Sequence, residues 1–117
     1  MAFLHKELAA GRWHAFSLAE QLGNIGSEVG RALHWRGKDE GLFEGAAERA
    51  LELLDLTIED PRWRGRAWEI ARAREVLCDA LSGGKEYKSS LEDLERYFYH
   101  FAFFARNKRE VIPASAK

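Results

Sequence analysis

This chain of 117 residues contains little cysteine and proline and carries almost no net charge. The one cysteine, Cys78, cannot form an internal disulfide, and no signal peptide is recognisable, so we expect a reducing, cytoplasmic setting. No stretch approaches the roughly 20 apolar residues that a membrane-spanning helix requires. A formal net charge of −1 gives no general attraction to nucleic acid or to anionic lipid. The sequence therefore excludes a disulfide-stabilised domain and predicts no membrane association.

The signature motifs of common enzymes and metal sites are also missing. We find no nucleophile motif, phosphate-binding loop or dinucleotide fingerprint. Metal sites inside helical bundles use Glu-x-x-His pairs, and none of the four histidines follows a glutamate at that spacing. One cysteine is too few for a typical zinc site. We therefore predict a protein with no catalytic residues, no metal and no cofactor.

What the sequence does contain is apolar residues at helical spacing. Hydrophobic residues make up 46% of the chain and charged residues 32%, which suits a soluble domain with one core. In the last segment, for example, Leu91, Leu94, Phe98 and Phe101 follow one another at intervals of three and four. The pattern predicts an N-terminal arm over residues 1–11 and a frayed tail over residues 108–117. Between them it predicts four helices, over residues 12–36, 40–59, 61–81 and 90–107.

Residues typical of helix ends separate these segments. Gly37 favours a helix C-terminus, and Asp39 is a natural N-cap for the next helix. Asp60 followed by Pro61 indicates a cap and a first helical residue, and a loop is expected around Gly83. Short connections place consecutive helices antiparallel. We therefore predict a single all-α domain of residues 1–117, an antiparallel up-and-down four-helix bundle with a short N-terminal helical arm.

Six of the fourteen aromatic residues lie close together in the last predicted helix, between residues 97 and 104. Phe98 and Phe101 share its apolar stripe, whereas Tyr99 and Phe103 are expected to point toward the opposite side. A helix that is apolar on more than one face is usually buried on more than one face, which so small a bundle hardly supplies internally. A thick aromatic core within one subunit, or a base-stacking or small-molecule pocket, is the alternative. We predict self-association through Tyr97, Tyr99, Phe103 and Phe104.

Three glycines, Gly23, Gly26 and Gly30, share one face of the first long helix. Glycine inside a helix costs about 1 kcal/mol relative to alanine, so we expect a compensating role for that face. Because glycine has no Cβ, another helix or a ligand can approach its backbone closely. We predict close helix packing at these three positions, and a groove for a ligand or partner is the alternative.

Charges of opposite sign are separated along the chain. Residues 38–60 hold eight acids and two bases, a net of −6, and residues 61–74 hold five arginines and one acid, a net of +4. The simplest interpretation is that the two helices are neighbours and pair their charges, at about 0–1 kcal/mol for each exposed pair. The alternative is a phosphate-binding patch in which basic and aromatic side chains alternate. Its candidate contacts are Arg62, Arg64, Arg66, Trp68, Arg106 and Arg109.

The stretch from Leu22 to Arg31 reads Leu-Gly-Asn-Ile-Gly-Ser-Glu-Val-Gly-Arg and precedes a helix of mixed acidic and apolar residues. It resembles the four-helix-bundle proteins encoded in ribosomal-RNA intervening sequences and their relatives, the accessory variability proteins of diversity-generating retroelements. The shared feature is Asn-Ile followed closely by glutamate, glycine and arginine, although Glu28 comes one residue late here. The resemblance implies an oligomeric bundle with nucleic-acid or protein partners.

These features favour a non-catalytic, self-associating helical bundle that acts as a scaffold or adaptor. We expect a homo-oligomer and a protein partner. A nucleic-acid-binding module that uses the basic and aromatic segment 62–68 is the alternative function.

Overall fold

The computed structural model describes the backbone of residues 11–115 and the side chains of residues 11–104. Within this part of the chain every regular element is a helix, and no strand is present. The elements are α2 (Leu18–Trp35), α3 (Glu40–Glu59), the 3-10 helix η1 (Pro61–Arg66), α4 (Ala67–Leu81) and α5 (Leu91–Ser115). None of these helices is long and apolar enough to cross a membrane. Residues 1–10 of the expected N-terminal arm lie outside the described residues.

The first long helix begins at Leu18, so the expectation that it starts at residue 12 is wrong. Ser17 and Glu20 form a capping box, in which the Glu20 N–H donates to the Ser17 hydroxyl and the Ser17 N–H donates to the Glu20 carboxylate. Upstream of the cap the chain turns, and the Phe16 N–H donates to the Trp13 carbonyl at 3.1 Å. The hydrogen bonding of α2 begins at this cap, so residues 13–16, which follow a helical segment at residues 11–13, form a separate turn. Trp13 and His14 bind this turn to the end of α3.

The second helix has the predicted bounds, 40–59, and Asp39 caps it by accepting the Leu42 N–H. The expected helix 61–81 is instead divided into η1 and α4, because Trp63 has a non-helical backbone (φ −106°, ψ 24°). The last helix runs on to Ser115 rather than fraying after residue 107. Between residues 107 and 112 the sequence has no glycine or proline that would end a helix.

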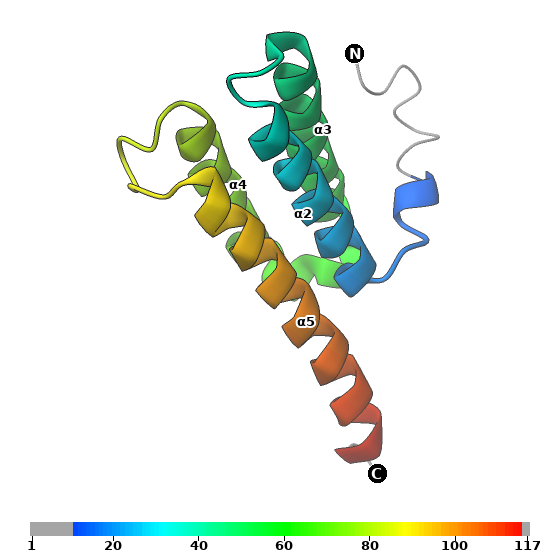
Figure 1. Cartoon of the computed structure of the whole chain (residues 1–117). Helices are drawn as coiled ribbons and strands as arrows, with labels where there is room; N and C mark the ends of the chain where they lie inside the picture. Colours follow the sequence, from blue (N-terminus) through cyan, green and yellow to red (C-terminus); the bar gives the residue numbers. More distant parts are fainter. Residues whose placement is uncertain (1–10, 116–117) are drawn as a thin grey trace.

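Successive helices run in opposite directions, and α2 lies between α3 and α5 (Figure 1). Along its length α2 packs against both neighbours, α3 also contacts α4, and the contact between α4 and α5 is smaller. The largest buried side chains come from all four α-helices and include Leu22, Leu54, Ile70 and Phe98. The C-terminal half of α5 extends beyond the ends of the other helices (Figure 1). That half therefore has few neighbours within its own chain.

Candidate functional site

The most unusual surface of the molecule is a set of exposed aromatic side chains on α5, here called the α5 aromatic face and consisting of Tyr97, Tyr99, Phe103 and Phe104. Their exposed fractions are 38%, 45%, 55% and 65%, respectively. The intervening Phe98 and Phe101 are buried in the core, and Ala102 is buried as well. The helix therefore buries one aromatic stripe and leaves aromatic side chains partly exposed on both flanks of that stripe, Tyr97 and Phe104 on one flank and Tyr99 and Phe103 on the other. Phe103 and Phe104 also touch each other edge to face, with centroids 6.0 Å apart.

Close contact between α5 and α2 positions Tyr99. A Cβ on Gly26 would lie 3.2 Å from Tyr99 Cε1 and 3.3 Å from Phe98 Cβ, so glycine allows the two helices to approach at this point. Tyr99, which was expected on the side opposite the apolar stripe, therefore lies partly against α2. Part of its ring rests on α2, and the rest is open to solvent.

The other two glycines of α2 have different surroundings. A Cβ on Gly30 would come within 2.6 Å of a carboxylate oxygen of Glu95, which is the mobile end of a long side chain. Gly23 has nothing within 4 Å of its Cβ position. At Gly26, side chains of α5 thus lie directly against the backbone of α2. Gly30 meets a side chain that could move, and Gly23 faces open space.

The arginines of the basic and aromatic segment 62–68 have different surroundings: some bind other groups of the protein, and others are exposed to solvent. Arg62 donates to the Asp60 carboxylate at 2.6 Å and to the Phe16 carbonyl at 2.8 Å, so its guanidinium is already occupied. Burial raises the pKa of Asp60, but the hydrogen bonds and charge of Arg62 outweigh that effect and bring the pKa below its usual value. The hydrogen bonds to Asp60 in turn raise the pKa of Arg62. Arg62 therefore acts here as a structural partner rather than as a free phosphate contact.

The remaining candidate phosphate contacts do not converge on one patch in the described residues. Arg66 lies over the ring of Phe101, with its Cζ 5.3 Å from the centroid. Trp68 is 78% exposed, and Arg64, four residues before it in the sequence, is exposed as well. The side chains of Arg106 and Arg109 lie outside the described part. Of the charge pairing expected between α3 and α4, the structure shows Arg74 with Asp55 at 2.6 Å.

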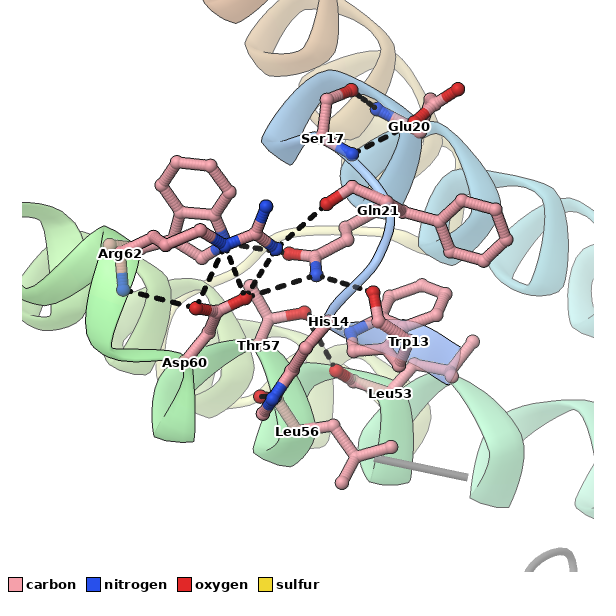
Figure 2. Close-up of polar contacts among 12 residues, drawn as sticks. Trp13, His14, Ser17, Glu20, Gln21, Leu53, Leu56, Thr57, Asp60 and Arg62 are labelled. Carbon is pink, nitrogen blue, oxygen red and sulfur yellow. Dashed lines mark hydrogen bonds and ion pairs between the residues drawn. The ribbon is translucent and has the colours of Figure 1, made fainter. Parts of the chain in front are cut away.

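A buried polar network that sequence reasoning did not predict lies at the end of α3 (Figure 2). Gln21, Thr57 and Asp60 are all buried. Gln21 accepts the Trp63 indole N–H at 2.8 Å and donates to the Trp13 carbonyl at 2.9 Å. The Trp13 indole N–H donates to the Thr57 hydroxyl, also at 2.9 Å.

This network joins the turn 13–16 to α2, α3 and η1 (Figure 2). Buried polar groups without partners are costly, and each of these side chains has at least one. The network therefore fixes how four segments meet, and it presents no free nucleophile or base. Asp60 could be recognised from its position before Pro61, whereas Gln21 carries no local signal beyond lying next to Leu22 in the apolar stripe.

Nothing in the described residues resembles a metal centre, since no three histidine, cysteine, aspartate or glutamate side chains come together. His14 lies with Nε2 3.0 Å from the Leu56 carbonyl, which ties the turn to α3. Cys78 is a free, half-buried thiol near Arg74.

The α5 aromatic face is thus the strongest candidate for an interaction site, and the exposed Trp68 with its neighbouring arginines is the second. A comparison with protein-family models, curated proteins and solved structures finds no match to this chain.

Proposed function

We propose that this protein is a non-catalytic scaffold or adaptor that self-associates through the α5 aromatic face. The observation that carries the proposal is the 38–65% exposure of Tyr97, Tyr99, Phe103 and Phe104 on α5, a helix that extends beyond the ends of the other helices (Figure 1). Fully covered aromatic side chains bury about 150–250 Å² each, so these four leave about 400 Å² of apolar surface in water. The largest apolar patch on a typical monomer has about this area and is often functional.

A second copy of the same helix suits this surface. Around the aromatic residues the charge of α5 changes sign, from three acids and one base over residues 91–96 to three bases and one acid over residues 105–110. Two copies of α5 packed antiparallel would bring the acidic end of each helix against the basic end of the other. About 800 Å² per partner is typical of a stable interface, so the aromatic face would supply its centre and the charged ends its rim.

The antiparallel up-and-down four-helix bundle is part of the same proposal. The alternating helix directions and the central place of α2 support it. A single free thiol suits a reducing cytoplasm, where such a scaffold would act. The resemblance of residues 22–31 to the bundle proteins of ribosomal-RNA intervening sequences likewise favours an oligomer.

Replacing both Phe103 and Phe104 with glutamine tests the proposal, because glutamine is a good helix former and removes the apolar rings. We expect the parent protein to scatter light as an oligomer and F103Q/F104Q as a single chain, with equal helicity by circular dichroism. The matched control is Trp68→Gln, which removes a more exposed aromatic ring from α4 and should leave the oligomer intact. A monomeric parent protein, or an unchanged mass for F103Q/F104Q, would refute self-association through α5.

Nucleic-acid binding is the second candidate function, and the 78% exposure of Trp68 favours it. Arg64 and Arg72, both exposed, lie four residues to either side, and single-stranded nucleic acids stack bases on such aromatic rings between cations. Under this alternative Trp68→Gln, and not F103Q/F104Q, would weaken binding to oligothymidylate. The affinity should also fall by about one log unit per log unit of salt for each phosphate neutralised. The two variants therefore separate the two functions.

A further inference from the structure

A cavity of about 360 Å³ lies between α4 and α5, next to the loop 82–90 that joins these two helices. Its volume falls within the range of sites for small organic ligands. Ala73 and Leu94, both buried, and the half-buried Val76 provide apolar lining, and Tyr97 supplies an aromatic wall. The cavity exists because α4 presents small side chains here and makes only a small contact with α5.

Two charged side chains line the cavity, but only one of them lacks a partner of opposite charge. The Asp93 carboxylate accepts a hydrogen bond from Arg96 at 2.6 Å and another from the Ser90 N–H at 3.2 Å, so its charge is balanced. Arg72 has no carboxylate within ion-pair distance among the described residues. The cavity therefore combines an apolar interior with one uncompensated positive charge.

The loop 82–90 holds Arg72 in place. The Asp79 carboxylate accepts the backbone N–H groups of Glu86 and Tyr87, at 3.0 Å and 2.9 Å, which fixes the loop against α4. The Tyr87 ring then lies against Arg72, whose Cζ is 5.0 Å from the ring centroid. A guanidinium stacked on an aromatic ring keeps its N–H edge available for a carboxylate. The arginine is thus oriented before any ligand arrives.

We propose that this cavity binds a small amphipathic monocarboxylate, with its aromatic or branched aliphatic part between Val76, Leu94 and Tyr97 and its carboxylate on Arg72. Arg72 matches the planar carboxylate group by two parallel, charge-assisted hydrogen bonds. A neutral amide could accept a hydrogen bond from the arginine but would lack the charge and the second oxygen of a carboxylate, and an amine would be repelled by the arginine. The site goes beyond the proposed scaffold role and would give the bundle a small-molecule effector.

Titration with 3-phenylpropionate tests the proposal, followed by ¹⁵N and methyl NMR of the full chain. We expect saturable shifts of Ala73, Val76 and Leu94 at millimolar ligand, and much smaller shifts with 3-phenylpropionamide and with 3-phenylpropylamine. Arg72→Gln should weaken carboxylate binding about tenfold, since it removes a charge-assisted pair while keeping the apolar lining. Arg64→Gln is the matched control, because it removes an exposed arginine that does not line the cavity.

Val76→Phe is a second, independent variant. The larger side chain at this half-buried lining position should fill the cavity and abolish binding. Absence of cavity shifts with the carboxylate, equal binding of the amine, or an unchanged affinity in Arg72→Gln would overturn the proposal. Tyr97 belongs both to this cavity and to the α5 aromatic face, so light scattering accompanies each titration. A parent protein that binds the carboxylate as a monomer would refute self-association alone, and a parent protein that is an oligomer but does not bind would refute the cavity proposal alone.

Discussion

At the scale of single residues, Asp60 is the side chain on which the end of α3 most depends. It is buried, it caps η1 by accepting the Arg62 N–H at 3.0 Å, and it forms an ion pair with the Arg62 side chain. It also accepts a longer hydrogen bond, 3.4 Å, from Gln21. Asparagine at this position could keep the cap but would lose the charge.

Replacing Asp60 with asparagine should lower the free energy of unfolding by about 2 kcal/mol at neutral pH, since a charge-assisted hydrogen bond to Arg62 is weakened. The pKa of Asp60 is lowered in the folded protein, so its stabilising effect is present above about pH 4 and disappears as the pH falls through the lowered value. The difference between the two proteins should therefore shrink in acid. Urea unfolding at pH 7 and pH 3 measures it.

Glu48→Gln is the control for that comparison, because Glu48 is an exposed acid in the middle of α3. It should change the free energy of unfolding little at either pH. An Asp60→Asn deficit that is equally large at pH 3 and pH 7 would show that the charge of Asp60 is not what stabilises this end of the molecule.

At the scale of helices, the contact between α2 and α5 depends on Gly26 and not on Gly23. Alanine at Gly23 meets open space and should stabilise the protein by up to about 1 kcal/mol through helix propensity. Alanine at Gly26 would lie 3.2 Å from Tyr99 and 3.3 Å from Phe98, which is tighter than ordinary contact, so crowding offsets the same gain. We expect Gly26→Ala to be less stable than Gly23→Ala by about 1–3 kcal/mol in thermal or urea unfolding.

Leucine at the same two positions makes the comparison sharper. It should be tolerated at Gly23 and cost several kcal/mol at Gly26, because a larger side chain forces α5 away from α2. If both positions accept leucine equally well, the two helices do not pack here as closely as the structure shows.

The helices themselves were largely predictable, because their apolar residues recur at intervals of three and four. The bounds of α3 agree with the prediction, since Asp39 and Asp60 mark both ends clearly. The start of α2 was missed because the apolar pattern continues upstream of Ser17, although Ser17 and Glu20 have the spacing of a capping box. The division of η1 from α4 depends on the backbone of Trp63, which no local pattern indicates.

At the scale of the whole molecule, the sequence could predict which helix has surplus aromatic residues but not how its own chain covers them. Periodicity placed Phe98 and Phe101 in the core, where they are. Tyr99 was expected on the opposite side, and only the approach of α5 to α2 at Gly26 shows that its ring is partly covered. The network around Gln21 was likewise hidden, because its partners lie about 8 to 42 residues away along the chain.

Self-association through α5 has a consequence for stability that does not depend on identifying any partner. If folded chains associate and unfolded chains do not, a higher protein concentration favours the folded state by mass action. Each tenfold rise in concentration should then raise Tm of the parent protein by a few degrees. F103Q/F104Q should melt at the same temperature at every concentration, because its surface no longer holds a second copy. Trp68→Gln should keep the concentration dependence of the parent, since its ring lies on α4. A Tm of the parent protein that is independent of concentration over a hundredfold range would mean that the exposed rings of α5 are not covered by another copy of the chain.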